Sequence, residues 1–371
     1  MLIGLPKEIK NHEYRVGLTP SSVRELTSHG HRVLVQSGAG SGVGFDDGQY
    51  TAVGASLART ANEVFAEAEM IVKVKEPQPH ECDMLRREQV LYTYLHLAPD
   101  PTQTAALVKS GAVCIAYETV TAPDGGLPLL APMSEIAGRM AIQAGAAHLE
   151  KSKGGMGVLL GGVPGVPSCH VLVIGAGVVG TQAMQMAVGL GARVTVLDTN
   201  VNRLRELDLV FGNRISTLYS SAQNIEDALR DAQLVIGGVL VPGAAAPKLV
   251  TRDMIAQMRE GSVVVDVAID QGGCFETSRP TTHAEPTYVV DGVVHYCVAN
   301  MPGAVARTST IALTNATLRY AVALADKGWR RALKEDLHLR HGLNVAQGEV
   351  TYEAVARDLS YSYVPADKLL N

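Results

Sequence analysis

Residues 170–198, which read HVLVIGAGVVGTQAMQMAVGLGARVTVLD, decide the fold of this chain. The apolar run HVLVI leads directly into Gly175, Gly177 and Gly180, which form a GxGxxG pattern. An apolar stretch with helical spacing follows, and a second apolar run, RVTVL, ends at Asp198. This order of strand, glycine turn, helix and strand is typical of a nucleotide-binding α/β domain with a doubly wound sheet.

Each glycine has a separate physical role in such a turn. Gly175 permits the tight turn after the strand, Gly177 lets the backbone approach a pyrophosphate, and Gly180 lets the helix pack closely on the strand. The start of the helix offers backbone N–H groups and the positive end of the helix dipole to the phosphates. The pattern therefore predicts a dinucleotide site.

The residue at the end of the second strand indicates which dinucleotide to expect. An acidic side chain here, Asp198, accepts a hydrogen bond from a ribose 2′-hydroxyl and repels a 2′-phosphate. We therefore expect NAD as the cofactor rather than NADP. Arg203 and Arg205 follow closely in the sequence and are able to weaken that preference.

Short apolar runs alternate with helix-like stretches on both sides of the glycine motif. This alternation favours parallel, doubly wound sheets. Besides the two runs in the motif, strands are expected at 2–5, 31–36, 70–75, 90–95, 113–117, 233–236, 262–266 and 294–298. Shorter helices are expected at 20–29, 60–68 and 101–110, and long helices at 131–152 and 304–327.

The length of 371 residues suggests more than one domain. We expect an α/β protein of two doubly wound domains joined by two long helices. Residues 1–130 would form the first segment of a catalytic domain, and residues 131–304 a Rossmann NAD-binding domain inserted in it. Residues 305–371 would form a long helix and a tail that returns to the catalytic domain, which is therefore discontinuous.

Composition and charge exclude several classes of partner. The net charge is −5, from 32 basic and 37 acidic residues, and no block of Lys and Arg is present, so neither nucleic acid nor a membrane surface is an expected partner. Residues 154–192 lack charged side chains, but prolines and glycines interrupt them, which favours a buried unit over a bilayer span. Five cysteines without metal-site spacing, and no signal peptide, predict a cytoplasmic protein.

Four polar residues follow strands at positions where open α/β sheets bind ligands. They are Arg15, Lys75, His96 and Asp270. Together they suit a small amino acid or 2-oxo acid, because Arg and Lys bind carboxylates and His transfers protons near neutral pH. An Asp is able to orient the imidazole or a water, or to stabilise a positive iminium.

Ordinary structural roles compete with each of these assignments. Lys73 is an alternative to Lys75, and Asp266 is an alternative to Asp270 in the same strand. Arg15 lies in a charged stretch and is compatible with a surface position. A single His after a strand is more often a surface or capping residue than a catalytic one.

Seven segments, read together, resemble bacterial alanine dehydrogenase within the alanine dehydrogenase/transhydrogenase family, over essentially the whole chain. The segments are GLPKEIKNHEYRVGLTP (4–20), VKVKEP (72–77), YLHLA (94–98), APMSEIAGRMA (131–141), VIGAGVVG (173–180), VVVDVAIDQGG (263–273) and HYCVANMPGAVARTST (295–310). Several long motifs in the same order are far more specific than any one of them.

The resemblance implies NAD-dependent oxidative deamination of L-alanine to pyruvate and ammonium, and the reverse reductive amination. It implies that Arg15 and Lys75 bind the substrate and that His96 and Asp270 are catalytic. It also implies a homohexamer. The cofactor contacts carried over, with the motif glycines, are Ser134, Gly175, Gly177, Val178, Gly180, Asp198, Arg203, Ser220, Val239, Leu240, Val267, Ala268, Ile269, Asp270, Arg279, Val298, Ala299, Asn300 and Met301.

One position departs from some relatives. Those relatives place a Glu and a His four residues apart on the late helix as a metal site, whereas Ala323 and Lys327 stand here. We therefore predict that no metal is required.

Other functions stay open at this stage. The soluble NAD-binding component of a transhydrogenase shares the fold, but it would normally differ where APMSEIAGRMA stands. A non-catalytic NAD-binding protein would need none of the four polar residues. A saccharopine-type dehydrogenase would need an acidic pocket for a long basic side chain, and no obvious candidate is present.

Overall fold

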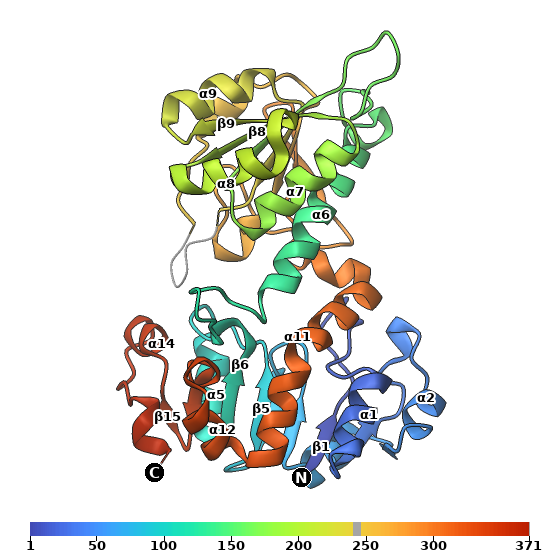
Figure 1. The fold of residues 1–371 in the computed structure, drawn as a ribbon, viewed down its shortest axis with the longest axis vertical. Coiled ribbons are helices and arrows are strands. Elements are labelled where there is room, and N and C mark those ends of the chain that lie inside the picture. The colour runs from blue at the N-terminus through green and yellow to red at the C-terminus, as the bar shows by residue number, and fades with distance from the viewer. Residues whose placement is uncertain (240–245, 371) are drawn as a thin grey trace. The chain divides into compact units, whose positions relative to one another are not determined.

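The computed structural model describes residues 1–239 and 246–370, which form two compact units. Unit 1 contains Met1–Met133 together with the C-terminal residues from Val305, and unit 2 contains Ser134–Ala304. Each unit is built on its own sheet (Figure 1). Within the described residues, no helix is both long enough and apolar enough to cross a membrane.

The sheet of unit 1 has the strand order β15-β14-β6-β5-β4-β1-β2-β3. Strands β1 to β6 pair in parallel. The chain runs from β1 through β2 to β3 and then returns to the other side of β1 at β4, so the topological switch point lies between β1 and β4. The strands are β1 (Leu2–Leu5), β2 (Arg32–Gln36), β3 (Ser56–Ala58), β4 (Met70–Val72), β5 (Val90–Thr93), β6 (Val113–Ala116), β14 (Leu343–Ala346) and β15 (Glu349–Val350).

The C-terminal part of the chain completes this sheet. Strand β14 pairs antiparallel with β6, with Leu343 opposite Ile115, and β15 pairs antiparallel with β14. In Figure 1 the red C-terminal elements accordingly lie beside the teal strand β6. The sheet is therefore mixed, with a parallel centre and an antiparallel edge.

Helices cover the sheet of unit 1, and local capping sets where several of them begin. Thr19 accepts a hydrogen bond from the backbone N–H of Ser22 and Pro20 fills the first helical position, so α1 begins there. Asp100 caps α5 in the same way, and Gly111 ends it in the left-handed conformation. The helices are α1 (Pro20–Ser28), α2 (Asp47–Thr51), α3 (Ala61–Glu67), α4 (Pro79–Cys82), α5 (Pro101–Ser110), α11 (Ala306–Lys327), α12 (Trp329–Glu335), α13 (Leu337–Arg340) and α14 (Glu353–Asp358).

Unit 2 has the strand order β12-β13-β11-β10-β7-β8-β9, and its switch point lies between β7 and β10. All neighbouring strands pair in parallel except β12, which is antiparallel to β13. The strands are β7 (His170–Ile174), β8 (Arg193–Asp198), β9 (Ile215–Tyr219), β10 (Leu234–Gly237), β11 (Val263–Asp266), β12 (Thr287–Val290) and β13 (Val293–Tyr296). The helices are α6 (Ala131–His148), α7 (Val178–Gly189), α8 (Val201–Phe211), α9 (Ala222–Asp231) and α10 (Arg252–Ala256).

The central strands of unit 2 are buried on both faces. Along β7, Val171 and Val173 pack into one apolar cluster, whereas Leu172 and Ile174 pack into another. Successive side chains of a strand point to opposite faces, so each cluster is the core between the sheet and one helical layer. The apolar run HVLVI is continuous for this reason.

The predicted fold class, two doubly wound α/β sheets, is confirmed. The predicted strands exist. The predictions for 70–75 and 90–95 were too long, because β4 ends at Val72 and β5 ends at Thr93. The long helix expected at 131–152 ends at His148. Strands β3, β9, β12, β14 and β15 were not expected.

Candidate functional site

Three of the predicted site residues follow neighbouring strands of unit 1. Arg15 lies in the connection after β1, Lys75 follows β4, and His96 follows β5. Strands β5, β4 and β1 are adjacent and parallel, so their carboxyl ends share one edge of the sheet. The structure therefore places all three residues at the edge that contains the switch point, where open sheets bind ligands.

Arg15 is buried and paired with a carboxylate that the sequence analysis did not single out. Its Nε and Nη2 donate to Oε1 and Oε2 of Glu13 at 2.7 and 2.6 Å, and the side chains are 2% and 0% exposed. The third nitrogen, Nη1, lies 3.1 Å from Sδ of Met133. Burial opposes the charge of Arg15, but the hydrogen bonds and charge of Glu13 raise its pKa above the usual value. Glu13 thus fixes one edge of the guanidinium.

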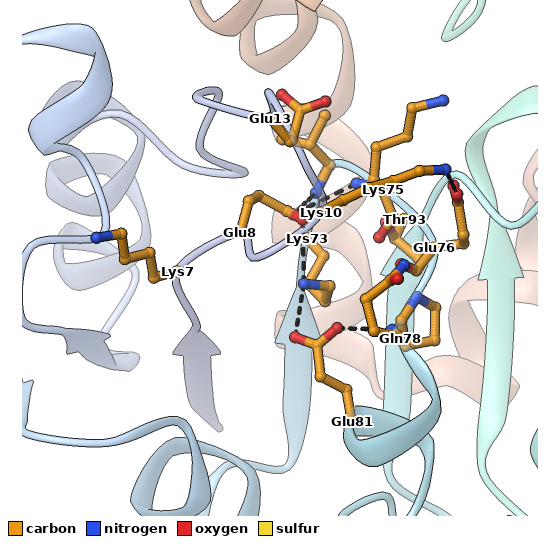
Figure 2. Close-up of polar contacts among 12 residues, drawn as sticks. Lys7, Glu8, Lys10, Glu13, Lys73, Lys75, Glu76, Gln78, Glu81 and Thr93 are labelled. Carbon is orange, nitrogen blue, oxygen red and sulfur yellow. Dashed lines mark hydrogen bonds and ion pairs between the residues drawn. The ribbon is translucent and has the colours of Figure 1, made fainter. Parts of the chain in front are cut away.

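Lys73 and Lys75, which compete in the sequence, have different environments. Lys73 is fully buried, and its Nζ lies 3.1 Å from Glu8 Oε2 and 2.9 Å from Glu81 Oε1. Figure 2 shows these two ion pairs at the end of β4. The Nζ of Lys75 has no hydrogen-bond partner within the residues that the structure describes, and the side chain is partly exposed. Lys73 is therefore a structural residue, and Lys75 keeps an ammonium group accessible to a ligand.

Glu8 connects this buried charge cluster to the backbone that bears Lys75. Its Oε1 accepts hydrogen bonds from the backbone N–H groups of Val74, at 2.6 Å, and Lys75, at 3.3 Å. Burial raises the pKa of Glu8 above its usual value, while the charge of Lys73 and the Val74 N–H oppose that shift. These bonds replace ladder bonds after β4 ends, and they fix where the side chain of Lys75 begins.

His96 has an unusual backbone conformation. Its φ is +50°, in the left-handed region that few residues other than glycine adopt. Its ring stacks on that of Tyr94, with centroids 5.8 Å apart and an interplanar angle of 14°. Tyr94 is fixed in turn by a hydrogen bond from its hydroxyl to the carbonyl oxygen of Leu129 (2.6 Å). The imidazole itself makes no hydrogen bond within the described part of the chain, so it is available to a substrate.

In unit 2, the glycine turn needs glycine at two positions and leaves open space at a third. A Cβ on Gly175 would lie 2.9 Å from the carbonyl oxygen of Gly238, and a Cβ on Gly180 only 1.9 Å from that of Gly175. A Cβ on Gly177, by contrast, would meet no atom within 4 Å. Gly177 is also the N-cap of α7 and has no side chain with which to cap it. Gly175 and Gly180 are therefore needed for the turn itself, and the open space at Gly177 fits a ligand phosphate.

Asp198 and Arg203 hold the glycine turn from two sides. The Asp198 carboxylate accepts hydrogen bonds from the backbone N–H groups of Ala176 and Asn200, both at 2.7 Å. Arg203 donates through Nε to the carbonyl oxygen of Ala176 (2.9 Å) and through Nη2 to the hydroxyl of Thr181 (2.8 Å). Arg203 is thus bound to the turn itself, and Asp198 lies at the end of β8, where a ribose is expected.

The structure gives Asp266 and Asp270 different roles. Asp266 is fully buried and accepts hydrogen bonds from the backbone N–H groups of Ala268 (3.1 Å) and Cys274 (3.0 Å) and from the hydroxyl of Ser278 (2.6 Å). Burial raises the pKa of Asp266, although the hydrogen bonds from Ser278 and Cys274 oppose the shift. Asp270 lies on the turn that Asp266 caps, Val267–Gln271, and is exposed. Asp266 is therefore structural, and Asp270 is the candidate for chemistry.

The other predicted cofactor contacts lie near the carboxyl ends of strands of the unit 2 sheet, with three exceptions. Ser134 lies in α6, Arg279 lies further along the chain with its guanidinium 4.0 Å from the ring centroid of Tyr288, and Leu240 lies outside the described residues. The rest are Val178 at the start of α7, Ser220 after β9, Val239 after β10, Val267, Ala268 and Ile269 after β11, and Val298, Ala299, Asn300 and Met301 after β13.

Clusters of ligating side chains and the state of the thiols describe the remaining reactive groups. Among residues 1–239 and 246–370, no group of three or more His, Cys, Asp or Glu side chains is arranged to hold a metal ion. The five cysteines are buried free thiols, and burial raises the pKa of Cys82 to about 12. A thiol that resists ionisation is a poor nucleophile.

Known proteins match the chain over essentially its whole length. The domain families described as "Alanine dehydrogenase/PNT, N-terminal domain" and "Alanine dehydrogenase/PNT, C-terminal domain" match residues 4–137 and 141–353. An alanine dehydrogenase from Halomonas elongata is 62% identical over 370 residues, covering 100% of both chains. A solved structure of an L-alanine dehydrogenase superimposes with a TM-score of 0.94 at 53% identity, covering 97% of this chain and 99% of that one.

A second solved structure matches the fold at lower sequence identity. A transhydrogenase from Sinorhizobium meliloti superimposes with a TM-score of 0.81, covering 95% of this chain and 100% of that one, but its sequence identity is 25%. The L-alanine dehydrogenase structure has both the higher TM-score and the higher sequence identity. The resemblance noted from the sequence motifs is therefore confirmed. The chain belongs to the alanine dehydrogenase/PNT family.

Proposed function

We propose that this protein is an NAD-dependent L-alanine dehydrogenase, which converts L-alanine to pyruvate and ammonium and catalyses the reverse reductive amination. The observation that carries the proposal is the 62% identity over the full length of an alanine dehydrogenase. The geometry supports it, because Arg15, Lys75 and His96 share one sheet edge at a switch point. We further propose a homohexamer in the cytoplasm, on the basis of the family.

We propose NAD as the cofactor, bound at the glycine turn of unit 2. The open space at Gly177 and the start of α7 suit its pyrophosphate, and Asp198 suits an unphosphorylated ribose. Bound NAD supplies the hydride acceptor. Arg203 supports this choice, since its Nε and Nη2 are bound to Ala176 and Thr181 and its Nη1 lies 2.7 Å from Glu206. An arginine held in this way is poorly placed to favour a 2′-phosphate.

In the proposed reaction, unit 1 binds the amino acid. Arg15 and Lys75 hold the substrate carboxylate, and this orientation supplies much of the rate. Loss of hydride from Cα of alanine with a neutral amine leaves an iminium, and Asp270 stabilises its positive charge. His96 accepts a proton from the water that adds to the iminium. It then returns that proton to the nitrogen and takes the hydroxyl proton as the carbinolamine collapses to pyruvate and ammonia, so that one proton is released overall.

The experiment that tests this function follows absorbance at 340 nm. The purified enzyme is assayed with NAD and L-alanine at alkaline pH, and in reverse with NADH, pyruvate and ammonium. Omission of ammonium and replacement by D-alanine are the controls. Turnover that requires the L-isomer and ammonium supports the proposal. Absence of turnover in a protein that binds NADH would refute it and favour a transhydrogenase component or a non-catalytic NAD-binding protein.

The roles of the individual residues need separate variants. His96→Ala and Asp270→Asn are expected to lose most turnover, ~10²–10⁴-fold for a general acid–base residue, while NADH binding is retained. Wild-type turnover in either purified variant would remove that residue from the mechanism.

A further inference from the structure

A carboxylate from a neighbouring strand end holds the backbone of His96. Glu118 lies in the short turn Tyr117–Thr119 that follows β6, and β6 pairs in parallel with β5. Its Oε1 accepts a hydrogen bond of 2.6 Å from the backbone N–H of His96, and its two oxygens lie 3.1 and 3.2 Å from the N–H of Leu95. One side chain thus accepts from two consecutive peptide groups at the end of β5.

These hydrogen bonds act on the residue with the strained conformation. A non-glycine residue at φ +50° has a conformational cost, and it stays there only if its surroundings hold it. Hydrogen bonds to an ionised carboxylate are among the stronger ones in proteins. Without them, His96 would relax toward the extended region, and its side chain would leave the direction it now has beside Tyr94.

The neighbouring strand end has the same arrangement. Glu8 accepts hydrogen bonds from the N–H groups of Val74 and Lys75 after β4, as Glu118 does from Leu95 and His96 after β5 (Figure 2 shows the Glu8 side). In both cases the second N–H belongs to a residue proposed to touch the substrate. The recurrence indicates that these carboxylates fix the directions of the site residues as well as ending the strands.

We propose that Glu118 is a positioning residue for the dehydrogenase reaction, which holds His96 in its left-handed conformation so that the imidazole faces the substrate. This inference rests on the proposed function and on the role of His96 in it. Glu118 acts through its oxygen atoms as acceptors of backbone hydrogen bonds. An oxygen at the right distance is therefore required, whereas a negative charge alone is not sufficient.

Three substitutions of Glu118 in the full-length enzyme test this role. Glu118→Ala removes both acceptors, and a displaced imidazole is expected to lower kcat ~10²-fold while the Kd for NADH is unchanged. Glu118→Gln keeps an oxygen at the same distance and is expected to retain most of kcat. Glu118→Asp keeps the charge but shortens the side chain, so it is expected to be less active than Glu118→Gln. Glu63→Ala is the matched control, since Glu63 Oε2 also accepts a backbone hydrogen bond, from Arg59 N at 2.8 Å, away from the site.

A double variant separates positioning from simple stabilisation. In the His96→Ala background, Glu118→Ala is expected to cause no further loss of kcat, because the side chain that it positions is absent. A further loss as large as the one in the wild-type background would refute the proposal. A higher kcat for Glu118→Asp than for Glu118→Gln would also refute the proposal. This comparison remains decisive even if Glu118→Ala does not fold.

The outcomes also separate this inference from the proposed function. An inactive wild-type enzyme, or a fully active His96→Ala variant, would contradict the function or the role of His96. An active wild-type enzyme with a slow His96→Ala variant and a fully active Glu118→Ala variant would contradict the positioning role alone.

Discussion

Arg15 and Glu13 form a buried ion pair in which two guanidinium nitrogens donate to the two oxygens of one carboxylate, at 2.7 and 2.6 Å. The two residues are separated by one position, and the side chain of each is almost fully buried. A bidentate pair of this kind fixes the plane of the guanidinium. The direction in which Arg15 presents its remaining N–H groups is therefore set before a substrate arrives.

Removal of Arg15 is expected to destabilise the protein as well as to inactivate it. Arg15→Ala removes the buried cation that pairs with the Glu13 carboxylate, and breaking a buried ion pair costs ~3–5 kcal/mol in the free energy of unfolding. Urea unfolding at neutral pH measures that loss. The double variant Arg15→Met/Glu13→Gln removes both charges and is expected to recover much of the stability but none of the activity. An Arg15→Ala variant as stable as the wild type would contradict this account of the pair.

The two lysines after β4 are expected to give opposite results. Lys73→Met leaves Glu8 and Glu81 buried without a cation, so the free energy of unfolding should fall by ~3–5 kcal/mol. Lys75→Met breaks no direct ion pair within the described residues and removes only a neighbouring charge from Glu76, so it should lower stability by much less than Lys73→Met does. The same Lys75 variant should raise the KM for pyruvate, because it lacks the ammonium that binds the substrate. A stable Lys73→Met variant with a raised KM would reverse the two assignments.

The stability of the protein in acid should depend on Glu76. Burial raises its pKa, but the charge of Lys75 and the hydrogen bond from Lys10 outweigh burial, and the pKa lies below the usual 4.5. A carboxyl group with a depressed folded-state pKa stabilises the protein above its unfolded-state pKa. That contribution is lost as the pH falls through the folded-state pKa.

Unfolding free energies measured from neutral pH down to about pH 3 test this dependence. Glu76→Gln cannot titrate at this position, so its stability should fall less steeply below pH 4.5 than that of the wild type. Lys10→Met removes one of the cations that depress the pKa and should flatten the acid dependence in the same direction. Parallel curves for wild type and Glu76→Gln would show that the carboxyl group titrates alike in the folded and unfolded chains.

Most buried strands were predictable from the sequence, whereas the edge strands were not. The run HVLVI is buried at every position, so its apolar character is continuous. Strand β9, Ile215–Tyr219, buries only its first residue, and β12, Thr287–Val290, has no fully buried residue. These edge strands are defined by pairing with a neighbour and carry little apolar signal of their own. Strand β14 was missed for another reason, since it is buried and lies inside the sheet. Asn344 interrupts its short apolar run, and the side-chain amide donates to Thr119 Oγ1 and to the carbonyl oxygen of Gly342.

The site shows the same division between local and tertiary information. The positions of Arg15, Lys75 and His96 followed from strand ends, which are local features of the sequence. Glu13 and Glu118 did not, because an acid that accepts backbone hydrogen bonds resembles any surface acid until the fold brings its partner close. Lys73 was a usable signal of a buried charge cluster. A lysine inside an apolar run is buried with its strand, so it needs buried carboxylates as partners.

The glycines of the dinucleotide turn should separate ligand binding from folding. Gly177→Ala adds a methyl group where no protein atom lies within 4 Å, and its φ of −69° suits alanine, so stability should stay within ~0.5 kcal/mol of wild type. The methyl group occupies the space proposed for the pyrophosphate, so NADH affinity should be lost. Gly180→Ala places its Cβ 1.9 Å from the Gly175 carbonyl oxygen and should lower both NADH affinity and stability, the latter by at least ~1–3 kcal/mol.

Gly189 provides a control within the same helix. It is the last residue of α7, and a Cβ there would also meet nothing within 4 Å. Gly189→Ala should therefore leave NADH affinity unchanged and raise stability slightly, because alanine loses less conformational entropy on folding than glycine. Fluorescence titration with NADH and urea unfolding of the three variants give both quantities. If Gly177→Ala bound NADH as tightly as Gly189→Ala, the pyrophosphate would not occupy the space at Gly177, and the proposed cofactor position would be wrong.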